Sequence, residues 1–192
     1  MAEDDLEKRL LQCRVSLEDI DLYRIKPDNP FLISDVQASI AERLVYEWLQ
    51  HCKVSFDKDF PRGSNGTTWT MNNRGIYVRK QGKIMHEYDS IVSFNGKTYL
   101  IEIKSFKLNG YPKKIPRAFE YAHQMYEGDI RMLIFFPHYN NRKKDAKRIV
   151  DEFPDVSVID THYKRANLNK AVLEYYRLTG YCIAGLKKRV KR

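Results

Sequence analysis

Long apolar runs are missing from this sequence of 192 residues. No stretch approaches the roughly 20 consecutive apolar residues that a helix needs to span a bilayer. The first residues, Met-Ala-Glu-Asp-Asp, are acidic and lack the hydrophobic segment of a secretory signal. These absences predict a protein that has no membrane partner and stays in the compartment of its synthesis, the cytoplasm.

Cysteine is also scarce. The three cysteines, Cys13, Cys52 and Cys182, lie far apart and form no Cys-x-x-Cys pair. An odd number excludes a complete set of intrachain disulfides, and the lack of a Cys/His cluster argues against a zinc site. The five histidines show no ligand spacing either, so each is interpreted as structural or exposed.

Positive charge is abundant and unevenly distributed, with a formal net charge of +9. Residues 1–30 carry eight acidic and five basic residues, whereas the rest of the chain carries 17 and 29. Such a surplus attracts polyanions and is typical of nucleic-acid-binding proteins, although membranes and acidic proteins attract it too. The length suits one domain over 1–192, with an acidic extension at 1–30 and a basic tail at 187–192.

Apolar periodicity predicts an α/β protein with a mixed central β-sheet flanked by helices. The helices are expected at 3–13, from a capping box at Ser34 and Gln37 to before Cys52, and at 115–127, 141–151 and 168–179. The strands are expected at 52–60, 76–79, 84–94, 97–106, 131–137 and 156–160, with a polar loop at 61–75. Asn95-Gly96 between two apolar runs predicts a tight hairpin, because both residues tolerate positive φ.

The second strand of this hairpin carries the residues best suited to chemistry. Side chains alternate along a strand, so Ile101 and Ile103 face one way while Glu102 and Lys104 face the other. Asp89 lies on the first strand, where pairing can bring it close to Glu102. Two neighbouring carboxylates repel each other, and Mg²⁺ is the hard cation that would hold them together. Lys104 would then lie beside the ion, able to orient or deprotonate water and to offset charge on a phosphate.

A plainer interpretation fits the same pattern. Glu102 and Lys104 that only face solvent on an amphipathic hairpin would give the same sequence. Glu42 lies at the border of the apolar face of its predicted helix. From that border its carboxylate could reach a metal held by the sheet, or it could be an ordinary helix edge.

A helix with Glu42 followed by strands with Asp89 and Glu102-x-Lys104 resembles the core of the PD-(D/E)XK nucleases. Ala41-Glu-Arg-Leu, Arg62-Gly-Ser64 and the run from Tyr88 to Lys104 resemble the archaeal Holliday junction resolvases of that superfamily, over about 34–128. Tyr88 stands where the family usually has proline.

The resemblance implies a restriction-endonuclease-like αβββαβ core and a Mg²⁺ ion, replaceable by Mn²⁺. By this likeness Asp89, Glu102 and the backbone carbonyl of Ile103 hold the metal, Lys104 assists the attacking water, and Glu42 completes the site. Resolvases of this kind act as symmetric dimers, so a homodimer is expected. A small, basic, stand-alone nuclease would suit an archaeal virus, and it would then act inside the host cell.

Basic and polar residues around these motifs are candidates for binding nucleic acid. They are Arg62, Ser64, Arg74, Lys113, Lys114, Arg117 and Gln124, of which Ser64 matches a resolvase serine near the scissile phosphate. The sequence therefore predicts a Mg²⁺-dependent nuclease that cuts DNA, as an endonuclease on branched or junction DNA. A non-catalytic nucleic-acid-binding protein on the same scaffold and an RNA endonuclease are the alternatives.

Overall fold

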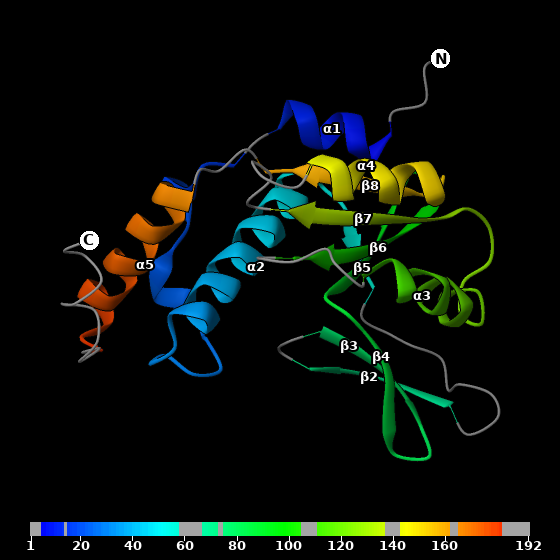
Figure 1. The fold of residues 1–192 in the computed structure, drawn as a ribbon, viewed down its shortest axis with the longest axis horizontal. Coiled ribbons are helices and arrows are strands. Elements are labelled where there is room, and N and C mark those ends of the chain that lie inside the picture. The colour runs from blue at the N-terminus through cyan, green and yellow to red at the C-terminus, as the bar shows by residue number, and fades with distance from the viewer. Residues whose placement is uncertain are drawn as a thin grey trace.

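The computed structural model describes residues 5–13, 15–57, 67–72, 75–104, 111–136, 143–161 and 165–181 (Figure 1). Its helices are α1 (Leu6–Gln12), α2 (Ile33–His51), α3 (Ile115–Ala122), α4 (Lys143–Glu152) and α5 (Arg165–Thr179), with 3-10 helices η1 (Leu17–Asp19), η2 (Leu22–Arg24) and η3 (Tyr111–Lys113). Its strands are β1 (Ser55–Phe56), β2 (Thr67–Asn72), β3 (Gly75–Lys80), β4 (Lys83–Tyr88), β5 (Ser90–Phe94), β6 (Lys97–Ile103), β7 (Ile130–Phe136) and β8 (Val156–Asp160). No helix in this part of the chain is both long and apolar enough to cross a membrane.

The central sheet has five strands in the order β1-β5-β6-β7-β8. Strands β1, β5 and β6 pair antiparallel, whereas β6, β7 and β8 pair parallel through the crossover helices α3 and α4. The expected mixed sheet flanked by helices is therefore confirmed. Asn95 and Gly96 take the positive φ values of 49° and 77° at the β5–β6 turn, as the hairpin prediction requires.

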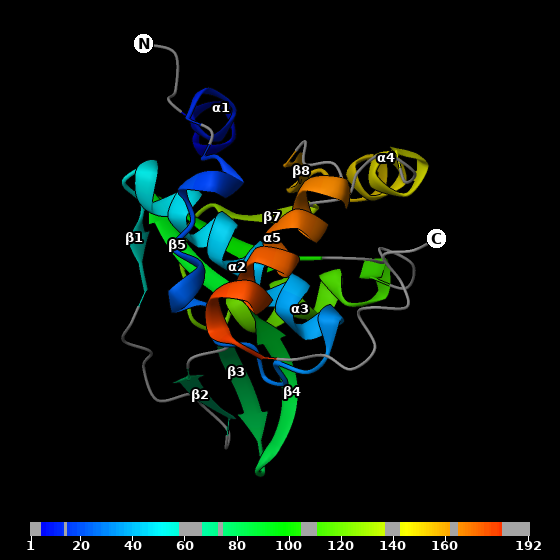
Figure 2. The ribbon, with the colours of Figure 1, turned by 90° about the vertical axis from the view of Figure 1, so that its left-hand side faces the viewer.

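Alternate residues of β6 and β7 divide the core into two layers. Leu100 and Ile134 face α3 and α4, in a cluster that also contains Ile115 and Ile149. The residues between them on the strands face α1 and α2, where Trp48 is fully buried. Helix α5 packs on the other side of α2, together with η1 and η2, in a third cluster (Figures 1 and 2).

A second, three-stranded antiparallel sheet has the order β2-β3-β4. It projects below the central sheet in Figure 1 and shares a hydrophobic cluster with it, because Trp69 and Val78 pack with Leu100. The predicted loop at 61–75 is thus wrong for Thr67–Asn72, which form strand β2. The strand follows from a period of two in burial, since Thr67 and Trp69 are buried while Thr68 and Thr70 are exposed.

The predicted strand 84–94 is two strands, because the chain passes from one sheet to the other at Asp89. Tyr88 holds the end of β4 in place. Its ring stacks on Trp69 at 5.6 Å between centroids, and its hydroxyl donates a hydrogen bond of 2.5 Å to the Ala118 carbonyl of α3. With Tyr88 held there, the backbone leaves β4 at Asp89 and enters β5 of the central sheet.

Three smaller predictions also need correction. Helix α2 starts at Ile33 with Leu32 as N-cap, so Ser34 is not a capping residue. In the turn before the helix, Asn29 Oδ1 accepts a hydrogen bond from the Phe31 N–H, and the helix then starts before the predicted cap at Ser34. The strand predicted at 52–60 is limited, within its described part, to Ser55–Phe56, which form β1. The helix predicted at 115–127 ends at Ala122, because turns with i to i+3 hydrogen bonds follow it.

Candidate active site

The alternation predicted for β6 brings Glu102 and Lys104 together on one face of the sheet. Both line a hollow of about 480 Å³ on the side of α3, whereas Ile101 and Ile103 line a second hollow on the side of α2. The Lys104 Nζ atom lies 2.5 Å from Glu102 Oε2, and the Glu102 side chain is only 3% exposed. A carboxylate and an ammonium are therefore paired at the end of a rigid strand.

Asp89 stands opposite Glu102 at the junction of the two sheets. The pairing of Ser90 with Ile101, continued by one residue, places Asp89 across from Glu102. Its Oδ2 atom accepts a hydrogen bond of 2.5 Å from the Ile103 N–H, in place of the main-chain acceptor that β5 would provide if it continued. The Ile103 carbonyl is expected to face the same edge, because the N–H and C=O of one strand residue point the same way. Asp89 lines both hollows, so it marks the border between them.

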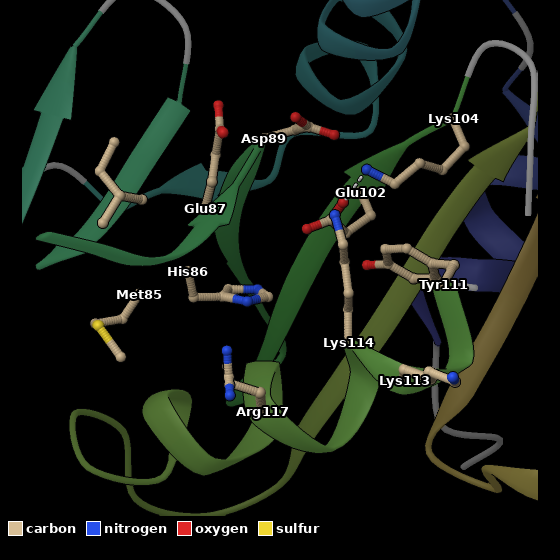
Figure 3. Close-up of a pocket in the computed structure, with 11 residues that line it drawn as sticks. Met85, His86, Glu87, Asp89, Glu102, Lys104, Tyr111, Lys113, Lys114 and Arg117 are labelled. Carbon is tan, nitrogen blue, oxygen red and sulfur yellow. Dashed lines mark ion pairs between the residues drawn. The ribbon is translucent and has the colours of Figure 1, made fainter.

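Tyr111, which the sequence analysis missed, completes the surroundings of Glu102 (Figure 3). Its buried side chain lies beside the Glu102 carboxylate and lowers the pKa of that group, its hydroxyl donates a hydrogen bond of 3.7 Å to Met132 Sδ, and its ring lies 4.9 Å from Lys104 Nζ. No motif marks Tyr111 in the sequence, because it reaches the site only through the fold of the segment before α3.

Burial and mutual repulsion disturb the ionisation of these carboxylates. Burial raises the pKa of Glu102 to about 7, with the Asp89 charge as the next cause and Lys104 in opposition. Burial also raises the pKa of Asp89, although Lys104 and the Ile103 N–H oppose it. For Lys104, burial lowers the pKa, but the charges of Glu102 and Asp89 outweigh it, so the net pKa is raised and the ammonium stays protonated at neutral pH.

Glu42 lines the same hollow as Asp89 but not the hollow that Glu102 lines. It lies on α2 and lines the second hollow, with a volume of about 940 Å³, on the opposite face of the sheet from Glu102. Its side chain is exposed, yet loss of surrounding water raises its pKa to about 7, with Asp89 as the next cause. Asp89 is thus the residue that connects Glu42 with the pair on β6.

The carboxylates match Mg²⁺ in their chemistry. Asp89 and Glu102 both offer hard oxygen atoms. Burial and then repulsion from Asp89 raise the pKa of Glu102, and a cation would relieve that repulsion. Within the ranges that the structure describes, no group of three or more His, Cys, Asp or Glu side chains forms a ready-made metal cluster. Mg²⁺ is commonly held by one or two carboxylates together with substrate phosphate and water, so the pair fits this ion.

The remaining candidates divide into three sets. Lys113, Lys114 and Arg117 are exposed and line the first hollow. Gln124 is exposed in the turn after α3 and lines neither of the two hollows described above. The other candidates lie outside the described residues: Arg62, Ser64 and Arg74.

No protein-family model matches this chain, and comparison with curated proteins finds none that is similar to it.

Gly75, at the start of β3, is expected to be essential for the position of Asp89. A Cβ atom on Gly75 would lie 2.5 Å from the Tyr88 carbonyl oxygen and 3.6 Å from the Asp89 Cα. We expect Gly75→Ala to lower the free energy of unfolding by about 1–3 kcal/mol through overpacking, measured by urea denaturation. Thr70→Ala, at an exposed position of the same sheet, should change it by less than about 0.5 kcal/mol. Equal stability of Gly75→Ala and the wild type would contradict the close approach.

Glu102 predicts a pH dependence of stability in the absence of divalent cations. Its pKa is higher in the folded state, about 7, than its ordinary value of 4.5, so the folded state binds its proton more tightly. The stability that it contributes is complete below pH 4.5 and is lost as the pH rises through 7. The difference in unfolding free energy between wild type and Glu102→Gln should therefore fall by on the order of 3 kcal/mol between pH 4.5 and 8.

Chemical denaturation across this pH range measures that difference. Glu120→Gln, at an exposed position of α3, is the control and should show no such trend. The pKa of the buried His86 is lowered to about 4, so this residue contributes a trend with pH of the opposite sign, which cancels because His86 is present in both proteins. A difference that does not change with pH would refute the ionisation of Glu102 given above.

Proposed function

We propose that this protein is a Mg²⁺-dependent nuclease that hydrolyses DNA phosphodiester bonds, as an endonuclease on branched DNA. The observation that carries the proposal is the ion pair of Lys104 and Glu102 beside Asp89, at the edge of a hollow that also exposes Lys113, Lys114 and Arg117. Carboxylates for a metal and cations for phosphates thus line the same hollow. The succession of α2, β1, β5, β6, α3 and β7, with β2–β4 inserted after β1, also supports the αβββαβ core that the resemblance to PD-(D/E)XK nucleases implies.

The residues of the site would divide the work. Asp89, Glu102 and the Ile103 carbonyl would hold the cation, with Glu42 approaching from the other hollow. When bound, Mg²⁺ supplies Lewis-acid stabilisation of phosphate charge and a more acidic water. Lys104 is held as an ammonium by its acidic neighbours, which favours orienting the water and stabilising the phosphate over accepting a proton.

A substrate panel tests the proposal directly. The full-length protein is incubated with linear, flap and four-way DNA and with matched RNA, in Mg²⁺, in Mn²⁺ and in a chelator. We expect metal-dependent cutting of DNA, strongest on the branched substrates, and none by Glu102→Ala. Cutting of RNA alone would favour the RNA endonuclease, and tight binding without cutting under every condition would favour a non-catalytic binding protein.

The homodimer implied by the resolvase resemblance stays a prediction. Sedimentation of the purified protein, alone and with a four-way junction, would measure it. Two protomers on each junction are expected, because two opposed strands must be cut.

A further inference from the structure

His86 is a buried polar residue in the wall of the first hollow that the proposed chemistry does not use. It lies on β4, is 8% exposed, and packs edge-on against the Tyr88 ring at 4.5 Å between centroids. Among the described residues, none provides a hydrogen-bond partner for its buried Nε2 atom. An unpaired buried nitrogen costs free energy, so a hydrogen-bond partner at this position would be favourable.

Positive charge surrounds the same space. Lys114 and Arg117 belong to the start of α3 and line the hollow with His86. Figure 3 shows the Arg117 guanidinium turned towards His86, and Lys114 extending from α3 towards Glu102. The first turn of α3 adds its dipole, because the N-terminus of a helix is electropositive.

The imidazole of His86 is held neutral in these surroundings. Its pKa is lowered to about 4, chiefly by burial and then by the charges of Lys114, Lys104 and Arg117. A neutral imidazole can donate one hydrogen bond, and two cations beside it attract negative charge. An anion in this space would satisfy both the nitrogen and the cations, which a water molecule would not.

We propose that His86, Lys114 and Arg117 form a phosphate-binding subsite at the α3 side of the first hollow, next to the carboxylate pair. The subsite rests on the proposed nuclease function for its natural ligand, a phosphate group of the DNA strand next to the bond that is cut. Bidentate contacts from Arg117 and a point charge from Lys114 are the usual means by which proteins bind this group. The phosphate comes either from a strand terminus, as a monoester, or from the interior of the strand, as a diester.

Inorganic phosphate is the probe for the subsite itself. The full-length protein, with ¹⁵N-labelled histidine and without divalent cations, is titrated with phosphate at constant pH and ionic strength. The His86 imidazole signals, assigned with His86→Gln, should shift in a saturable manner. Arg117→Ala and Lys114→Ala, both at exposed positions, should each weaken phosphate binding by about tenfold or more.

Lys8→Ala is the matched control, because Lys8 is an exposed lysine of α1 that lines neither hollow. It should leave the titration unchanged. No saturable shift in the wild type, or an equal loss in Lys8→Ala, would overturn the subsite in favour of a diffuse charge effect. Cleavage assays test the proposed function separately. Phosphate binding without any cleavage would support the subsite and refute only the proposed nuclease activity.

DNA substrates distinguish the two sources of the phosphate. KM is measured for linear DNA with a 5′-phosphate, a 3′-phosphate or hydroxyl ends, and for closed circular DNA. If the subsite binds a terminal phosphate, Arg117→Ala should raise KM about tenfold only for the linear DNA that carries the phosphate at one particular end. If it binds an internal phosphate, KM for the circular DNA should rise by the same factor. An unchanged KM on every substrate would show that substrate phosphate does not use the subsite.

Discussion

Lys104→Met is expected to lower the rate of Mg²⁺-dependent DNA cleavage by about 10²- to 10⁴-fold. Methionine keeps much of the length of the side chain but removes the ammonium that lies 2.5 Å from Glu102 Oε2. In the proposed function, the lost charge would stabilise the phosphate and orient water as the bond breaks. Single-turnover cleavage of a branched DNA, with enzyme in excess, measures the chemical step.

Lys97→Met is the matched control for this change. Lys97 lies at the other end of β6, where it pairs with Asp129 at 3.7 Å, and it should cut at the wild-type rate within about twofold. Circular dichroism should show both variants folded. A Lys104→Met protein that cuts as fast as Lys97→Met would remove Lys104 from the chemistry.

Asp89→Asn is expected to abolish tight binding of the metal and to lower cleavage by at least about 100-fold, since a catalytic cation contributes several kcal/mol. Asparagine keeps an oxygen that can accept the Ile103 N–H, so the junction between the two sheets should persist. The change removes the negative charge that raises the pKa of both Glu42 and Glu102. Mn²⁺ binding, followed by electron paramagnetic resonance, reports on the metal independently of cleavage.

Asp155→Asn controls for the general loss of one acidic charge. Asp155 is an exposed residue just before β8 that lines neither hollow, and its variant should bind Mn²⁺ and cut DNA as the wild type does. If Asp89→Asn retained full Mn²⁺ affinity, the cation would have to bind elsewhere. The pKa of Glu102 should also fall in Asp89→Asn, which a pH titration of stability can detect.

Local patterns predicted the parts of the site that lie on one strand. The period of two along β6 gave Glu102 and Lys104 a common face, and Asn95-Gly96 set the β5–β6 turn whose pairing register continues to Asp89 and Glu102. These features depend on neighbouring residues alone, so the sequence contains them. The apolar faces of α2 and α3 were visible for the same reason.

Residues that reach the site from other elements were not visible in this way. His86 and Tyr111 looked like any other histidine and tyrosine, because their positions depend on packing between β4, α3 and β6. The break at Asp89 was missed because 84–94 reads as one continuous strand. The sequence also did not show that Glu42 lines the second hollow, on the other face of the sheet from Glu102.

The sequence by itself determined the mixed α/β class and the pairing of a carboxylate with an ammonium on β6, because strand periodicity and turn chemistry act over a few residues. Only the tertiary structure decided that Asp89 stands at a junction between two sheets and that a buried His86 faces the cations of α3. Those placements arise from long-range packing of Tyr88 on Trp69 and Ala118, and no short stretch of sequence encodes such contacts.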